Sequence, residues 1–160
     1  FRMTDDSKFV LRWEVDNATA KFAAGTVESE VFHKRGFEWT VTAERDVRGA
    51  TDFTVRCNED RIGPWKCESD LIMNQHLKNG GVRHVWKIKK RACFNENNCS
   101  WVRNCVNWTW NNITDSDYLI NDKVTFELHF NIISSQRTEF SADLDKFAIP
   151  NELSNVILKI

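Results

Sequence analysis

The side chains best suited to chemistry in this sequence are its five cysteines and four histidines. Zinc-binding cysteines usually stand in pairs two to four residues apart, and no cysteine pair here has that spacing. Cys93, Cys99 and Cys105 follow one another at intervals of six residues, with no histidine close to them. We therefore expect reduced thiols, no metal site and a reducing compartment. One or two disulfides are the alternative if the protein is secreted.

Sequence motifs of enzymes do not occur in the chain. It lacks a nucleophile elbow, a Walker phosphate loop, a dinucleotide-binding glycine pattern and a zinc-protease HExxH pair. His129 falls on the polar face of a strand pattern, and His84 falls on an apolar face, which predicts a histidine in the core or at its rim. These observations favour a non-catalytic protein without a cofactor.

Seven tryptophans are the unusual feature of the composition. Trp13, Trp39 and Trp86 lie on the apolar faces of strand patterns and are expected in the core. Trp101, Trp108 and Trp110 lie in an asparagine-rich stretch, where they could serve either the core or a recognition surface. Exposed tryptophans would also suit a glycan-binding protein.

The overall charge makes some partners improbable. The chain has 22 basic and 23 acidic residues, without the basic surplus of a nucleic-acid-binding protein. It has no apolar run of about 18 residues that would cross a membrane. The sequence thus favours a protein that contacts neither nucleic acid nor membrane.

Alternation of apolar and polar residues dominates the chain and predicts the elements that position these side chains. Residues 124–132 give the clearest example, since five apolar side chains alternate there with four polar ones. Similar patterns occupy residues 8–15, 37–43, 52–57, 65–73 and 82–88, with turn signals between them. This predicts an all-β, antiparallel sandwich of about seven or eight strands. For residues 101–110 we expect a strand that leads into a short helical turn.

Several segments together resemble the MATH (TRAF-like) domain family. The opening strand Phe9–Asn17 resembles the first strand of that family, and the segments Ser29–Phe32 and Gly36–Trp39 resemble its S-x-x-F and G-x-x-W patterns. Trp101 is similar to the tryptophan of a later strand, although Val102 replaces the usual glycine. Tyr118–Phe126 resembles the closing motif, with Asp122 retained. The resemblance covers residues 8–133 and implies a MATH β-sandwich, so we assign residues 1–133 to that domain.

The C-terminal part predicts a second unit. Residues 134–146 are polar and predict a linker, and residues 147–160 resemble the first strand of a BTB domain, with Asn155 in place of an aspartate. MATH followed by BTB is the layout of substrate adaptors of cullin-based ubiquitin ligases, including a large nematode group and the speckle-type POZ protein. The resemblance thus implies a homodimeric adaptor, in the cytoplasm or nucleus, that binds a cullin through its BTB domain.

In this family an extended peptide lies along a sheet edge, and the resemblance carries that groove onto particular residues. Matched by position, the candidate peptide-binding residues are Phe53, Glu68, Cys93, Phe94, Trp101 and Arg103. Because Arg103 stands where an aromatic residue is common, we expect a more acidic or a differently shaped partner segment. The alternatives are a TRAF-type signalling adaptor and a secreted glycan- or protein-binding MATH module. Glycosylation of Asn107 or a Cys93–Cys105 disulfide would favour the secreted module.

Overall fold

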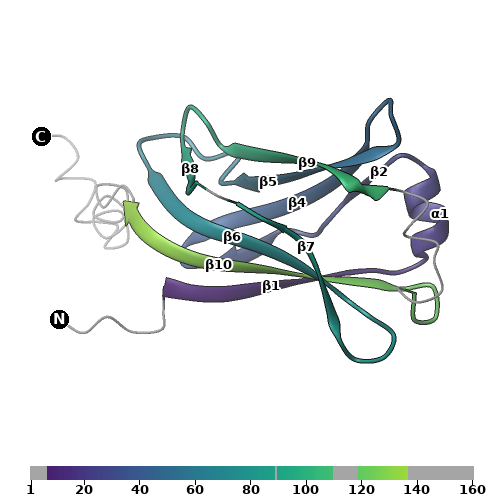
Figure 1. Cartoon of the computed structure of the whole chain (residues 1–160). Coiled ribbons are helices and arrows are strands. Elements are labelled where there is room, and N and C mark those ends of the chain that lie inside the picture. The colour runs from purple at the N-terminus through teal and green to yellow at the C-terminus, as the bar shows by residue number, and fades with distance from the viewer. Residues whose placement is uncertain (1–6, 89, 110–118, 137–160) are drawn as a thin grey trace, which may run out of the picture.

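Two antiparallel sheets packed face to face form the body of the protein (Figure 1). The computed structural model describes residues 7–88, 90–109 and 119–136. Ten strands and one short helix, α1 (Ala18–Ala23), lie within these ranges. The predicted all-β antiparallel sandwich is confirmed.

The first sheet has the strand order β1-β10-β6-β7, and β8 also pairs with β6. Its strands are β1 (Lys8–Val15), β10 (Val124–Gln136), β6 (Lys66–His76), β7 (Val82–Lys87) and β8 (Ala92–Asn95). The second sheet has the order β2-β4-β5-β9, and β3 also pairs with β4. Its strands are β2 (Thr26–Glu28), β4 (Phe37–Arg45), β5 (Ala50–Cys57), β9 (Ser100–Thr109) and β3 (Phe32–Lys34). β9 and β7 therefore each end a sheet.

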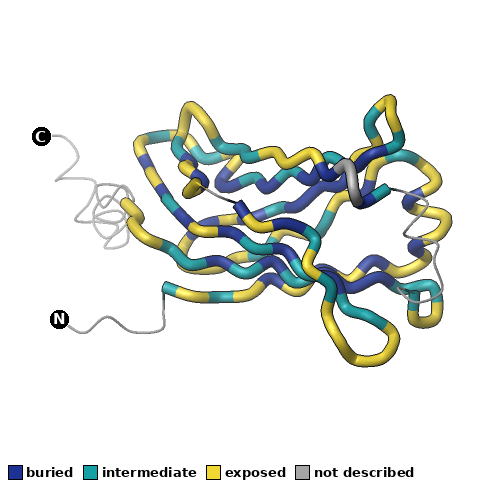
Figure 2. Tube along the Cα trace, viewed as in Figure 1, coloured by how far each residue is buried: buried dark blue, intermediate teal, exposed yellow. Residues whose placement is uncertain are grey.

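The alternating pattern of the sequence becomes the alternation of buried and exposed positions along the strands (Figure 2). In β10 the apolar residues predicted to share a face are buried from Val124 to Phe130, and only Ile132 at the end is partly exposed. The adjacent strands β1 and β6 pair with β10 in register and bury their own apolar residues on the same face. The apolar face of each sheet thus packs against the apolar face of the other sheet.

Trp39 of β4 lies at the centre of the layer between the sheets and is fully buried. Its ring packs against two aromatic rings of the first sheet, with centroid distances of 4.6 Å to Phe130 and 5.5 Å to Phe94, and lies 6.1 Å from Phe37 of its own sheet. Its indole Nε1–H donates to the carbonyl of Lys34 at 3.2 Å, which satisfies the polar atom of the buried ring. Trp39 therefore joins the two sheets through its ring contacts, while its hydrogen bond stays within the second sheet.

Helix α1 covers one end of the sandwich and depends on a distant residue for its start. Its first residue follows Asn17, whose side chain makes no capping hydrogen bond. Asp122 supplies the acceptors: its carbonyl accepts from the Ala18 N–H at 2.8 Å, and its carboxylate accepts from the N–H and hydroxyl of Thr19 at 3.0 and 2.6 Å. These bonds serve N–H groups that a helix leaves unpaired at its N-terminus. They also lower the pKa of Asp122, the side-chain bond from Thr19 contributing most.

Two boundaries differ from the sequence prediction. Residues 101–109 form extended strand instead of ending in a helical turn, and the register of β9 against β5 shifts between Cys105 and Thr109. Strand β10 continues to Gln136 because residues 134–136 pair with the start of β6, so three residues predicted as linker belong to the sheet. The remaining linker and the BTB-like residues 147–160 lie outside the described residues. Among the described residues, no helix is both long and apolar enough to span a membrane.

Replacing Trp39 with alanine is expected to lower the free energy of unfolding by about 3–5 kcal/mol, because it removes a fully buried aromatic ring from the layer that joins the sheets. Urea denaturation of the variant and the parent protein measures the difference. Val10→Ala is the control, since Val10 is 43% exposed and should cost little. Similar losses for both variants would contradict the central role of Trp39.

Candidate functional site

The candidate site lies where the end strands of the two sheets, β7 and β9, run close to each other (Figure 1). Within the described part of the chain, β9 pairs with β5 alone and β7 with β6 alone. Each strand therefore has one side whose N–H and C=O groups have no strand partner. Such edges are ready acceptors for an added strand.

A groove of about 350 Å³ lies between these two strands. Strand β7 lines it with Arg83, His84, Val85 and Trp86, and β9 lines it with Arg103, Asn104, Cys105 and Trp108. Its lining thus combines cationic side chains with indole rings. Among the residues that the structure describes, no carboxylate belongs to the lining.

Trp101 of β9 and Trp86 of β7 form a ring contact between the two edge strands. Their ring centroids are 4.9 Å apart, and Trp86 is buried whereas Trp101 is only half-buried. Trp101 therefore keeps part of its ring available to a partner while resting on a fixed neighbour. A rigid aromatic surface of this kind gives contact area at little entropic cost.

Arg103 lies two residues further along β9, so its side chain leaves the strand on the same side as Trp101. Its side chain is exposed, and its guanidinium group influences the neighbouring thiol of Cys105. Burial raises the pKa of Cys105 to about 11, although the charge of Arg103 acts to lower it. Cys105 is thus a protonated, nearly buried thiol at neutral pH, and Arg103 supplies the positive charge of this part of the groove.

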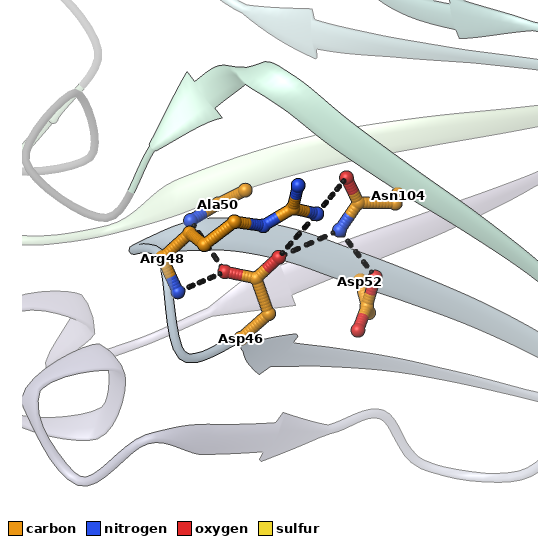
Figure 3. A network of polar contacts seen from close by, with 5 residues as sticks. All are labelled: Asp46, Arg48, Ala50, Asp52 and Asn104. Atoms are coloured by element: carbon orange, nitrogen blue, oxygen red, sulfur yellow. Dashed lines mark hydrogen bonds and ion pairs between the residues drawn. The ribbon is translucent and has the colours of Figure 1, made fainter.

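The middle of β9 is held in place by a polar network at the turn between β4 and β5 (Figure 3). The amide Nδ2 of Asn104 donates to Asp46 at 2.9 Å and to Asp52 at 2.7 Å. Asp46 also accepts from the backbone N–H groups of Arg48 and Ala50, at 2.8 and 3.0 Å. The network ties the residue next to Arg103 to two separate segments of the sheet, which fixes the backbone from which Arg103 projects.

Two of the residues predicted from the resemblance lie in the core. Phe53 and Phe94 have no exposed surface. Phe53 packs against Trp108 at a centroid distance of 5.2 Å, and Phe94 packs against Trp39. We correct their placement in the groove accordingly, because the space between the sheets takes up both rings completely.

The other four predicted residues form two separate pairs. Trp101 and Arg103 share the groove side of β9. Glu68 and Cys93 are neighbours across β6 and β8, where Glu68 makes an ion pair of 3.1 Å with Lys66 and Cys93 is exposed. Both neighbours of Glu68 along β6 are buried, so Glu68 and Cys93 face away from the core on the first sheet. The structure thus places only Trp101 and Arg103 at the β9 edge.

The sequence interpretation missed the contribution of β7 to the groove. A register shift in the pairing of β6 with β7 places Trp86 opposite buried Met73 but His84 opposite half-buried Asn74. His84 is therefore exposed and turned from the core, contrary to its position in the apolar alternation. Of the other two tryptophans that the sequence left between core and recognition surface, Trp108 is buried, and its indole N–H donates to Gln75 at 2.9 Å. Trp110 lies outside the described residues.

Within residues 7–88, 90–109 and 119–136, no three histidine, cysteine or acidic side chains are arranged to hold a metal ion. All five cysteines are free thiols, including Cys93 and Cys105. The site is therefore best described as an open strand edge with an aromatic and cationic groove.

Comparison with known proteins finds a domain family for most of the chain. The family model of the MATH domain matches residues 18–132, which include both edge strands. No curated protein matches the chain significantly.

Replacing Asp46 with alanine is expected to lower stability at neutral pH, by an amount that shrinks in acid. Burial acts to raise the pKa of Asp46, but the bonds from Asn104, Arg48 and Ala50 together lower it below its ordinary value of 3.8. A carboxyl whose pKa is lower in the folded state stabilises the fold above its unfolded pKa, and this contribution is lost as the pH falls through the folded value.

Urea midpoints of parent and Asp46→Ala protein, measured from pH 7 to pH 3, should therefore converge below pH 3.8. The control is Asp60→Ala, which removes an exposed carboxylate in the loop after β5. A difference between parent and Asp46→Ala protein that stays constant over this range would mean that the network does not depend on the ionised carboxylate.

Proposed function

Because the chain belongs to the MATH domain family, a family of protein-interaction modules, we propose that its β9 edge captures an extended segment of a partner protein. The observation that carries the proposal is the open edge of β9 beside a groove lined by indole rings and cations. No catalytic group takes part in this function.

Main-chain bonding would supply the affinity common to all partner segments. A strand that aligns with β9 can exchange N–H···O=C bonds with the groups that β5 does not use. Such bonds form with any sequence except at proline, so they give little selectivity by themselves. Selectivity must come from the side chains that point into the groove.

The spacing along β9 sets the pattern of the partner segment. Trp101 and Arg103 are two residues apart, and in a paired strand alternate residues also face the same side. A residue that meets Trp101 and a residue that meets Arg103 are therefore separated by one residue in the partner. We infer an apolar side chain at the first position and a carboxylate at the second.

The charge of the groove supports an acidic partner. Arg83 and Arg103 approach it from the two edge strands, with His84 beside them. The two carboxylates beside Asn104, Asp46 and Asp52, both accept from its amide, and Asp46 also pairs with Arg48. A carboxylate entering the groove would meet the exposed guanidinium of Arg103, and charge-assisted hydrogen bonds would favour it.

In the cell, this binding would serve as the substrate-recognition arm of a cullin-based ubiquitin-ligase adaptor. The support for this role is the BTB-like sequence of residues 147–160 after the MATH domain. A BTB domain would dimerise the protein and hold the cullin, in the cytoplasm or nucleus. The MATH domain would then bring the substrate to the ligase.

Binding is expected to fall about tenfold or more in Trp101→Ala and in Arg103→Glu, because each removes a side chain of β9 that faces the partner segment. The probe is a displayed library of random ten-residue peptides. Selected peptides are then synthesised, and their affinities are measured by fluorescence anisotropy. Peptides selected with the parent protein should be enriched in aspartate and glutamate. Replacement of those residues with asparagine and glutamine should weaken binding.

Arg12→Glu is the matched control for charge. Arg12 is likewise an exposed arginine on an end strand, but it lies on β1 at the other end of its sheet from β7. It should bind like the parent. Equal binding by Arg103→Glu and Arg12→Glu, or by acidic and amidated peptides, would reject the acidic groove. A melting temperature of Trp101→Ala as low as that of Trp39→Ala would show that Trp101 serves the core.

The ligase role is tested with the protein extended beyond Ile160, used to capture binding proteins from native cell extract. A cullin should be recovered with both the parent and the Trp101→Ala/Arg103→Glu variant, whereas client proteins should be recovered with the parent alone. Clients lost from the variant without any cullin in either sample would support peptide capture and reject the adaptor role.

A further inference from the structure

Two cysteines face each other where β9 joins the second sheet. Arg56 of β5 pairs with Ser100 of β9, and the ladder continues by one residue because the Cys57 N–H donates to the Cys99 carbonyl at 2.8 Å. Cys57 and Cys99 are therefore directly opposite each other on antiparallel segments. Neither belongs to the groove between β7 and β9.

The geometry of this pairing lies within reach of a disulfide bond. Directly opposed residues of a hydrogen-bonded antiparallel pair have Cα atoms about 5.5 Å apart, and their side chains leave the ladder on the same face. Disulfides join residues whose Cα atoms are about 4.4–6.8 Å apart. Both side chains contact the core, and Cys99 contributes to the raised pKa of Cys57 by placing a second ionisable thiol near it.

The two thiols differ in access to solvent. Cys57 has no exposed surface, whereas Cys99 is half-buried. A solvent-borne oxidant can therefore reach Cys99 first. Cys67 also lies close enough to affect Cys57, but it belongs to β6 in the opposite sheet and is fully buried. Because Cys67 is as buried as Cys57, a solvent-borne oxidant reaches neither of them as readily as Cys99, and this favours Cys99 as the partner of Cys57.

We propose that Cys57 and Cys99 form a redox-modification site, at which a peroxide converts the two thiols into a reversible cross-strand disulfide. This inference does not depend on the partner segment or on the ligase role. The site would covalently fasten the first residues of β9 to the end of β5.

The reaction proceeds in two balanced steps. The Cys99 thiolate attacks hydrogen peroxide, so that a sulfur–oxygen bond forms, the oxygen–oxygen bond breaks, and water leaves after proton transfer. The Cys57 sulfur then attacks the sulfur of the Cys99 sulfenic acid, so that the sulfur–sulfur bond forms and the sulfur–oxygen bond breaks. The departing hydroxyl group takes the Cys57 proton and leaves as a second water. Two thiols have lost two electrons and two protons, and one peroxide has become two waters.

Burial also decides the rate and the reversibility. Burial, more than the neighbouring Cys67 and Cys99, raises the pKa of Cys57, so its thiolate is scarce and the second step is slow. The Cβ atoms of a hydrogen-bonded pair stand further apart than the roughly 3.8 Å of a relaxed disulfide, so the bond would be strained. Strained disulfides are more easily reduced than structural ones. The cross-link should therefore form gradually and be removed by dithiothreitol.

The test treats the reduced protein with hydrogen peroxide, blocks the remaining thiols with iodoacetamide and maps the cross-linked peptides by mass spectrometry. Cleavage after arginine, lysine and glutamate separates the candidates, because Cys57 falls in residues 57–59, Cys99 in residues 97–103, and Cys93 and Cys67 in other peptides. The expected product is a dithiothreitol-sensitive link between peptides 57–59 and 97–103, with a mass loss of two hydrogens in the intact protein.

Cys99→Ser should abolish the link while leaving the protein folded, because only a half-buried side chain is changed. Cys93→Ser, which changes an exposed thiol, is the matched control and should leave the link intact. The proposal is overturned if Cys57 remains fully alkylatable after unfolding of the oxidised protein, or if the linked pair is Cys57–Cys67 or includes Cys93. Trapping of Cys99 sulfenic acid without later loss of the Cys57 thiol would overturn it as well.

Discussion

The structure depends on the closure of two apolar sheet faces around a continuous layer of aromatic rings. Trp39 has ring neighbours in both sheets, and its buried N–H is satisfied by the chain that precedes its own strand. Phe9 stacks on Phe130 at 4.5 Å, which extends the layer to the outermost strand of the first sheet. With the inner faces packed together in this way, the unpaired main-chain groups of the sheets lie at their lateral edges.

The lateral edges are not equivalent. At β1, Arg35 donates to the carbonyl of Lys8 and places its guanidinium 5.7 Å from the centre of the Phe9 ring, so a side chain of the other sheet covers part of that edge. At β9, the neighbouring groups are half-buried Trp101 and exposed Arg103. The charged side chain of Arg35 thus protects the β1 edge from unwanted pairing. The difference supports β9 as the edge at which a partner strand is accepted.

Much of the sandwich was predictable because burial on one face imposes a period of two, as residues 124–132 show. Depth within that face was not predictable, since Phe53 and Trp101 both point inward but only Trp101 lies near a rim. Register irregularities also made the directions of several side chains in β7 and β9 unpredictable from the sequence. The shift in β9 allows Trp101 and Trp108 to face the interior although seven residues separate them, and the shift in β7 turns His84 outward. Neither β7 nor β9 contains a glycine or proline that would indicate such an irregularity in the sequence.

The capping of α1 by Asp122 has a consequence for the order in which the chain can fold. Asn121 and Asp122 both have positive φ angles, 54° and 57°, in a two-residue turn closed by paired bonds between Ile120 and Lys123. This turn leads into β10, and its carboxylate contacts Thr19, 103 positions earlier. A six-residue helix is too short to persist alone. During synthesis α1 can therefore become stable only after Asp122 has left the ribosome. Its docking would then be one of the last steps in the folding of the domain.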